Sequence, residues 1–257
     1  MITLHADSSA KTREAFHMIR FDCHVHSVAS GHAFGTMEEI AAYCRTYHMD
    51  GFALTDHGPA MPGSVNWIYF SAIRMVPRDL QGVKILRGIE ANLMDFEGKL
   101  DLQDSLLEKL DVVIVSFHDL LIQPGTRQEH TRALVAAAQN PFVDILGHTG
   151  RGGYAYDIPT VLKACRDTGT MIEVNRWTLK GDPENVACYE IARGCKELGV
   201  PIVINSDAHT ADQVGRVDEA FDLVCSLGIP ETLIINRTYE AFRAHQEKRK
   251  PWLDFSR

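Results

Sequence analysis

Two histidines with a single residue between them, followed closely by a third, mark the first part of the chain that could bind a metal ion. His24 and His26 stand in the segment F-D-C-H-V-H-S from Phe21 to Ser27, and His32 follows after a short stretch of loop character. Residues i and i+2 of a β-strand point to the same side, so both imidazoles of the pair would face one site. Such a pair at a strand end, with a third imidazole nearby, is typical of half a metal site. Two polar residues leaving a strand are the simpler alternative, and the rest of the chain decides between them.

Residues that can bind a metal ion or an anion recur at the carboxyl end of every segment with the character of a β-strand. After the first segment they are Asp56 and His57, Glu90, His118 and Asp119, His148, Asn175 and Arg176, and Asp207 and His209. Seven of the 12 histidines occupy such positions. A random scatter of histidines would not follow strand ends, so we interpret them as parts of one site.

The donor types indicate the chemistry of this site. Seven imidazoles, Glu90 and Asp207, with no cysteine among them, suit Zn²⁺, Mn²⁺ or Fe²⁺ and do not fit a cysteine-rich structural zinc site. A catalytic zinc ion takes about three protein ligands plus water, so nine donors indicate two or three clustered ions. A carboxylate such as Glu90 is suited to bridge a pair of them. Clustered divalent ions generate hydroxide near neutral pH and hold the oxygens of a phosphoryl group.

The segments that would position these residues alternate between short apolar runs and longer amphipathic stretches. The predicted strands are Met18–Cys23, Gly51–Thr55, Val83–Ile89, Val112–Phe117, Val143–Leu146, Met171–Val174 and Pro201–Ile204. The predicted helices include Met37–Tyr47, Arg127–Gln139, Ile158–Thr168, Asn185–Leu198 and Val217–Leu227. Continuously apolar strands rich in Val and Ile are typical of a buried parallel sheet. Thr36 and Glu39 have the spacing of a capping box, and Gly169 and Gly199 stand where glycines end helices.

Seven strand–helix repeats without a break in composition predict one α/β domain with a closed or nearly closed β/α barrel. Functional groups of such barrels lie at the carboxyl ends of the strands, where the loops converge on one mouth. A doubly wound open sheet is the alternative, and its dinucleotide-binding form is disfavoured because no G-x-G-x-x-G follows the first strand. Residues 1 to 17 show no clear period and are predicted to form an N-terminal extension, with residues 18 to 257 forming the barrel domain.

Composition narrows the class of protein. The 257 residues are 45% hydrophobic and 23% charged, as in an ordinary globular protein, and the net charge is −8. An acidic chain has no general electrostatic attraction for nucleic acid. The six cysteines include no C-x-x-C pair, which indicates reduced thiols. The sequence has neither a signal-peptide pattern nor a run of membrane-spanning length, so we expect a cytoplasmic protein with no membrane partner. The composition is compatible with an oligomer as well as with a monomer.

The motifs together resemble those of a known superfamily. They are D-C-H-V-H-S at Asp22–Ser27, T-D-H-G-P at Thr55–Pro59, G-I-E-A-N at Gly88–Asn92, F-H at Phe117–His118, G-H at Gly147–His148 and S-D-A-H-T at Ser206–Thr210. In this order they resemble the PHP (polymerase and histidinol phosphatase) superfamily over about residues 18 to 245. The T-D-H-G-P and R-G-I-E-A-N forms are most similar to its YcdX-type phosphatase branch.

The resemblance implies a distorted seven-stranded (β/α)7 barrel that holds a trinuclear metal centre, with Zn²⁺ as the expected ion and Mn²⁺ or Fe²⁺ as alternatives. It assigns His24, His26, Glu90 and Asp207 to one ion, Glu90 with His118 and His148 to the second, and His32, His57 and His209 to the third. The fifth motif of the family commonly reads His-Pro, whereas this chain has His148-Thr149-Gly150. That departure changes the stiffness of the loop and leaves the ligand in place.

Other residues near the strand ends have expected supporting roles. Asp22 and Asp56 are predicted to accept N–H bonds from metal-bound imidazoles and so to fix their tautomers. Arg176, where the sixth strand meets the mouth, is predicted to hold a substrate phosphate by a bidentate contact. Arg87 and Arg151 are the rival candidates for that contact.

The function predicted from these residues is that of a metal-dependent phosphoesterase. It would hydrolyse a small phosphomonoester by attack of a metal-bound hydroxide, with Glu90, Asp207 and Arg176 as its catalytic residues. Hydrolysis of a phosphodiester, as by a nuclease, is the nearest alternative, and the acidic charge and single-domain length favour the small substrate. Carbon–nitrogen hydrolysis of the amidohydrolase type, and metal binding without catalysis, are further alternatives.

Overall fold

The structure is a computed structural model that describes residues 19–182 and 185–255. The predicted N-terminal extension, and Met18 at the start of the first predicted strand, lie outside these residues. The strands are β1 (Phe21–Val25), β2 (Gly51–Leu54), β3 (Asp79–Leu80), β4 (Val83–Asn92), β5 (Val112–Ser116), β6 (Ile145–Leu146), β7 (Met171–Asn175) and β8 (Ile202–Asn205). The α-helices are α2 (Met37–Thr46), α3 (Trp67–Ala72), α4 (Asp104–Leu107), α5 (Arg127–Gln139), α6 (Ile158–Thr168), α7 (Arg176–Gly181), α8 (Val186–Leu198), α9 (Asp218–Ser226) and α10 (Tyr239–Arg249).

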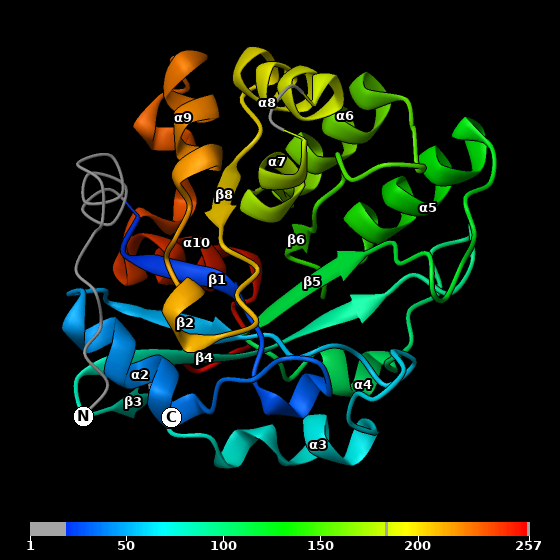
Figure 1. The fold of residues 1–257 in the computed structure, drawn as a ribbon. Helices are drawn as coiled ribbons and strands as arrows, with labels where there is room; N and C mark the ends of the chain where they lie inside the picture. Colours follow the sequence, from blue (N-terminus) through cyan, green and yellow to red (C-terminus); the bar gives the residue numbers. More distant parts are fainter. Residues whose placement is uncertain (1–18, 183–184, 256–257) are drawn as a thin grey trace.

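Seven parallel strands follow one another around the sheet in chain order, β1-β2-β4-β5-β6-β7-β8, and the short β3 pairs antiparallel with β4. A doubly wound sheet reverses its strand order at a switch point, and this order never reverses. Helices α5, α6 and α8 lie along one side of the strands, and α2 and α3 lie along the other (Figure 1). The predicted β/α barrel of seven parallel strands is therefore confirmed.

The barrel is nearly closed, and a side chain completes the seam between its first and last strands. An isolated parallel bridge joins Val25, the last residue of β1, to Ala208 in the loop after β8. Below it, the buried Asn236 donates its amide N–H groups to the carbonyls of Phe21 (2.9 Å) and Ile204 (2.8 Å). Its own carbonyl accepts the backbone N–H of Ile204 at 3.0 Å. One asparagine thus satisfies backbone groups that an unpaired strand edge would leave buried without partners.

The helix signals in the sequence are confirmed, whereas several strand ends differ from the prediction. Thr36 and Glu39 form the capping box of α2, and Gly169 and Gly199 end α6 and α8 in the left-handed conformation. Strand β4 continues three residues beyond its predicted end, so Glu90 lies inside the strand. The reason is tertiary, because the last residues of β4 pair with β5, and pairing partners are not visible in a local pattern.

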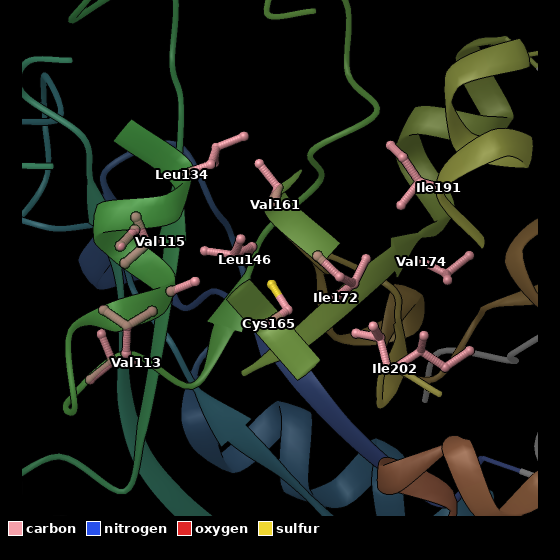
Figure 2. Packing of buried hydrophobic residues seen from close by; sticks show 14 of the residues in the cluster. Val113, Val115, Leu134, Leu146, Val161, Cys165, Ile172, Val174, Ile191 and Ile202 are labelled. Carbon is pink, nitrogen blue, oxygen red and sulfur yellow. The ribbon is translucent and has the colours of Figure 1, made fainter. Parts of the chain in front are cut away.

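The core has two layers on opposite faces of the barrel wall. On the outer face, Val113 and Val115 of β5, Leu146 of β6, Ile172 and Val174 of β7 and Ile202 of β8 lie in one cluster with Leu134, Val161, Cys165 and Ile191 of the helices (Figure 2). Inside the barrel, Phe21 packs against Tyr239 and Phe242 of α10, with ring centroids 5.5 Å apart in each pair. Helix α10 therefore closes the amino end of the barrel with apolar side chains, which leaves the carboxyl end for polar groups.

Candidate metal centre

All nine predicted metal ligands gather at the carboxyl end of the barrel. His24 and His26 come from the end of β1 and the residue after it, Glu90 comes from β4, and His57, His118, His148, Asp207 and His209 come from the loops after β2, β5, β6 and β8. His32, beyond a short 3-10 turn, is joined to the group by its ring contacts. Its ring centroid lies 4.9 Å from that of His57 and 5.0 Å from that of His209.

Glu90 is the centre of the cluster. Its Oε2 lies 2.7 Å from Nδ1 of His57, 3.3 Å from Nε2 of His24 and 3.5 Å from Nε2 of His26, while its Oε1 lies 2.9 Å from Nε2 of His148 and 3.4 Å from Nε2 of His118. The two oxygens of one carboxylate therefore face two different sets of imidazoles. A bridging carboxylate between two metal ions requires this division.

Asp207 is a second carboxylate that faces the same histidines. Its Oδ1 lies 3.2 Å from Nε2 of His26, 3.6 Å from Nε2 of His24 and 3.7 Å from Nδ1 of His209. Asp207 has φ of +54° and His148 has φ of +29°, a region that residues other than glycine rarely occupy. Such conformations cost about 1–3 kcal/mol each and concentrate at functional sites.

Four buried polar atoms around Glu90 have no hydrogen-bond partner among the described residues. They are Nε2 of His24, Nε2 of His26, Nδ1 of His57 and Oε2 of Glu90. The short approach of His57 to Glu90 lacks the alignment of a hydrogen bond. Each unpaired buried group costs about 1–3 kcal/mol. Unpaired nitrogen and oxygen atoms that face one another in this way fit divalent cations, which would pair with all of them at once.

Three groups of donors in the described residues are compact enough to hold an ion, with ligand atoms within 4.8 Å of one another. They are His24, His26 and Glu90; His57, Glu90 and His118; and His26, His57 and His209. The first agrees with the assignment implied by the family resemblance. In the second group His57 joins Glu90, although the resemblance assigns His57 to the third ion. In the third group His26 joins His57 and His209, although the resemblance assigns His26 to the first ion. None of the three groups includes His32 or His148. The division of the nine ligands among three ions therefore stays a prediction.

The charges of the cluster suit cations. Burial by itself would raise the pKa of Glu90, but the neighbouring imidazoles, His24 foremost, hold it well below its usual range. Burial by itself would also raise the pKa of Asp207, but the charge of His24 outweighs this effect and holds the pKa well below its usual range. Burial and the neighbouring His57 hold the pKa of His26 well below its ordinary value. The carboxylates are thus ionised and His26 has a free lone pair for a metal. His24, in contrast, must give up a proton to bind an ion, because, although burial lowers its pKa, the carboxylates around it, Glu173 foremost, hold it well above its ordinary value.

Glu173 is a residue in contact with the candidate ligands that the sequence reasoning missed. It is buried in β7, where its Oε1 lies 2.7 Å from Nδ1 of His24 and its Oε2 accepts the backbone N–H of His148 at 2.7 Å. It also accepts an amide N–H of Asn205 at 2.9 Å. A signal was present, because Glu173 is the one charged residue in the apolar stretch M-I-E-V-N, and a carboxylate in a buried strand needs partners.

The supporting roles predicted for Asp22 and Asp56 are not found in the predicted form. The prediction for Asp22 is wrong, because the loop after β8 occupies its oxygens through the Ser206 hydroxyl and the backbone N–H of Gly215. Asp56 acts through an intermediate, since it accepts the Ser30 hydroxyl at 2.7 Å, and that hydroxyl lies 3.1 Å from Nδ1 of His26.

Two other imidazoles have direct partners behind them. Nδ1 of His118 lies 2.8 Å from Oδ1 of Asn92 in β4. Nδ1 of His209 lies 3.0 Å from the backbone carbonyl of Asp207. Such contacts fix the tautomer and the orientation of a ring, so that its other nitrogen faces the metal.

The three candidate arginines lie in different places. Arg176 is largely buried and donates from Nε to Glu219 at 3.0 Å, and Arg87 donates from Nε to the carbonyl of Val76 at 2.9 Å. Arg151 instead lines a pocket of about 350 Å³ together with seven of the predicted ligands. Its Nη2 donates to Oδ2 of Asp207 at 3.0 Å. These contacts favour Arg151 over Arg176 as a phosphate anchor, because the guanidinium of Arg176 is already paired with a carboxylate outside the metal cluster.

Residues 22–176 match the family model of the PHP domain. This chain belongs to the PHP family. A probable phosphatase of Acetivibrio thermocellus is 41% identical to this PHP protein over 232 residues, which are 89% of this chain and 95% of that protein. A probable phosphatase of Caldanaerobacter subterraneus subsp. tengcongensis is 42% identical over 234 residues, 89% of this chain and 92% of that protein. The enzyme class predicted from the sequence, a hydrolase of the phosphatase type, is confirmed.

Two solved structures share the fold of this PHP protein. Histidinol phosphate phosphatase from Lactococcus lactis, solved with zinc, L-histidinol and phosphate, has a TM-score of 0.62 at 20% identity and matches 82% of this chain and 94% of its own. A chain in the structure of archaeal ribonuclease P with mature tRNA has a TM-score of 0.56 at 15% identity and matches 91% of this chain and 93% of its own. At these identities the likeness concerns the barrel alone. Within the described ranges, every helix is too short or too polar to cross a membrane.

Proposed function

We propose that this PHP protein is a metal-dependent phosphatase that hydrolyses small phosphomonoesters at a centre of three divalent ions. The observation that carries the proposal is the division of the Glu90 carboxylate between two sets of imidazoles, with unpaired buried donor atoms around it. The names of the curated relatives support the reaction class. Zn²⁺ is the proposed ion, with Mn²⁺ and Fe²⁺ as alternatives, because the donors are nitrogen and oxygen only.

The proposed ligands are the nine residues predicted from the sequence. They are His24, His26, His32, His57, Glu90, His118, His148, Asp207 and His209. Divalent ions at these ligands would lower the pKa of a water molecule towards neutrality and offset the charge of the phosphoryl oxygens. Glu173, Ser30 and Asn92 hold three of the imidazoles from behind, so that the ring nitrogens facing the cluster keep their direction.

Arg151 is the proposed anchor for the phosphate, in place of Arg176. Its side chain is 42% exposed at the mouth, and its present partner there is the carboxylate of Asp207. A metal ion bound to Asp207 would compete for that carboxylate, which leaves the planar guanidinium able to hold two phosphoryl oxygens. Its place in the loop after β6 puts this contact beside His148.

The test is hydrolysis by metal-loaded protein of p-nitrophenyl phosphate, with bis-p-nitrophenyl phosphate as the diester control. We expect hydrolysis of the monoester, its loss after chelator treatment, its return with added Zn²⁺ or Mn²⁺, and more than one ion per chain by elemental analysis. Faster hydrolysis of the diester would favour the phosphodiesterase alternative. Metal-loaded protein without activity on either ester, or retention of at most one ion after saturation and desalting, would contradict the proposal.

A further inference from the structure

A tryptophan at the start of α7 contacts the backbone of a predicted metal ligand. Nε1 of Trp177 donates to the carbonyl of Asp207 at 3.0 Å, although the two residues are 30 positions apart in the chain. The same carbonyl lies 3.0 Å from Nδ1 of His209. Among the residues that the structure describes, no other hydrogen-bond donor reaches this oxygen. A carbonyl oxygen has two lone pairs, so the indole and the imidazole together use both.

We propose that Trp177 is a positioning residue of the metal centre, which holds the Asp207 carbonyl in place and thereby orients two of the proposed ligands, Asp207 and His209. This inference rests on the metal centre of the proposed function and does not depend on which ester is hydrolysed. It differs from the carboxylate, hydroxyl and amide supports described above, because the indole acts on the backbone of a ligand and not on its ring.

The backbone of Asp207 has a conformation that needs such support. Its φ of +54° is one that residues other than glycine rarely adopt, and a strained conformation persists only where its surroundings hold it. The neighbours on both sides are held by β1, since Ser206 donates its backbone N–H to a carboxylate of that strand at 3.4 Å and Ala208 donates to the carbonyl of His24 at 3.3 Å. The carbonyl of Asp207 itself has no partner in a strand. The indole of Trp177 takes that part.

The Asp207 carbonyl connects the indole to two ligand side chains. With Trp177 on one lone pair, the Nδ1–H of His209 takes the other, which leaves Nε2 of that imidazole as the nitrogen that can bind an ion. Relaxation of the Asp207 backbone would also turn its Oδ1 away from Nε2 of His26, which lies 3.2 Å from it. Loss of the indole bond should therefore weaken metal binding near Asp207 and His209 and spare the ligands that follow β5 and β6.

Helix α7 keeps the indole directed at this carbonyl. Trp177 is the second residue of α7, and Asn175 caps the helix by accepting the backbone N–H of Thr178 at 3.1 Å. Nζ of Lys180 lies 4.4 Å from the centre of the indole ring, where a cation is attracted to the ring face. Asn175 also donates its amide N–H to Oδ2 of Asp207 at 3.3 Å. The start of α7 thus contacts Asp207 at its backbone and at its carboxylate.

Two replacements remove the indole N–H. Trp177→Phe also reduces the volume of the ring, whereas replacement of Trp177 by benzothienylalanine keeps a bicyclic ring of the same shape and has sulfur in place of the N–H. Trp252→Phe is the matched control, because Nε1 of Trp252 also donates to a backbone carbonyl at 3.0 Å, that of Glu108. Trp252 follows α10, the helix that closes the amino end of the barrel.

The first experiment measures zinc affinity by chelator competition, starting from metal-free protein whose folding is checked by thermal unfolding. We expect both replacements of Trp177 to lower the affinity by about tenfold, as for the loss of a contact that orients a ligand. Trp252→Phe should keep the wild-type affinity. The visible absorption spectrum of the Co²⁺-loaded protein depends on the ligand geometry around the ion, so it should change for the two Trp177 replacements alone.

The benzothienylalanine variant decides the role of the N–H. Wild-type zinc affinity and a wild-type Co²⁺ spectrum in this variant overturn the proposal. A loss of affinity confined to Trp177→Phe also overturns it, because the volume of the ring and not its hydrogen bond would then be what matters.

The second experiment asks whether Trp177 acts through the Asp207 carbonyl. In a His209→Ala background no imidazole depends on that carbonyl, so Trp177→Phe should lower zinc affinity by less than it does in the wild type. In a His118→Ala background it should keep its full effect of about tenfold. An equal effect in all three backgrounds overturns the route through the carbonyl.

The outcomes separate this inference from the proposed function. A wild type that binds metal ions, together with Trp177 variants of equal affinity, overturns the role of Trp177 and leaves the phosphatase function standing. A wild type that binds no metal ion overturns the metal centre, and the role of Trp177 falls with it.

Discussion

Glu173 holds His24 in place from behind. Oε1 of Glu173 lies 2.7 Å from Nδ1 of His24, and both side chains are fully buried. Nε2 of His24 consequently faces Glu90 at 3.3 Å and Asp207 at 3.6 Å. A carboxylate behind a ligating imidazole fixes its tautomer and raises its basicity towards the metal.

Glu173→Gln should lower metal affinity by about 10- to 100-fold, because the amide keeps the shape of the side chain but loses the charge. Chelator competition measures the affinity, and thermal unfolding of the metal-free protein reports any purely structural effect. Glu240→Gln is the control for the loss of a carboxylate elsewhere. Metal affinity equal to that of wild type, with only the unfolding temperature changed, would limit Glu173 to a structural role.

Glu90→Gln and His32→Ala should differ in metal content. Glu90 faces five imidazoles through two oxygens, so its amide variant should lose metal from two positions and lose phosphatase turnover. His32 is exposed at the edge of the cluster, so its removal should spare the ions near Glu90 and part of the activity. Elemental analysis after saturation and desalting checks both variants. Full metal content in Glu90→Gln would mean that Glu90 does not bridge.

Arg151→Met and Arg176→Met should separate phosphate binding from stability. Arg151 lines the pocket, so its loss should raise KM and weaken inhibition by inorganic phosphate by about tenfold or more, as expected for a bidentate charge-assisted contact. Arg176 pairs with Glu219, so its loss should act mainly on the unfolding temperature. Phosphate inhibition constants and thermal unfolding, measured on both variants, decide the matter. If Arg176→Met weakened phosphate inhibition and Arg151→Met changed only the unfolding temperature, Arg176 would be the anchor.

Acidification should release the metal. An imidazole must be deprotonated to bind an ion, so affinity falls on acidification over a window that extends from about 6.5, the ordinary pKa of histidine, down to the pKa of His148, which burial lowers to about 4. Metal content measured after equilibration and desalting at a series of pH values should decrease on the acid side and be regained after return to neutral pH. Constant metal content down to about pH 4, where free histidine is fully protonated, would contradict ligation by imidazoles.

Lys250→Met should destabilise the fold. The buried Lys250 donates from Nζ to Oδ2 of Asp144 at 2.5 Å and to the carbonyl of Leu110 at 3.1 Å, which fastens the end of α10 under the barrel. Removing one partner of a buried pair costs about 3–5 kcal/mol, because the other charge stays buried. Urea unfolding measures this loss. Asp144→Asn added to Lys250→Met should recover part of it, and the exposed Lys248→Met should stay within about 0.5 kcal/mol of wild type.

The sequence by itself determined the barrel and the positions of the nine candidate ligands along it. Apolar runs of strand length, helix-start signals such as the capping box of Thr36 and Glu39, and glycines at helix ends are local patterns. Chain order then places every strand end at one mouth, because parallel strands joined by helices all point the same way. For this reason His24, Glu90 and Asp207 could be assigned to one site before any distance between them was known.

Only the tertiary structure decided which side chains support the ligands. Glu173 and His24 are 149 residues apart, and Asn236 completes the seam of the barrel from 215 residues beyond Phe21. The partners of Asp22 and the choice between Arg151 and Arg176 likewise depend on loops that meet only after folding. A local pattern depends on a residue and its near neighbours, whereas a hydrogen-bond partner depends on which distant backbone the packed core brings within about 3 Å. The first is encoded over a few residues, and the second by the whole chain.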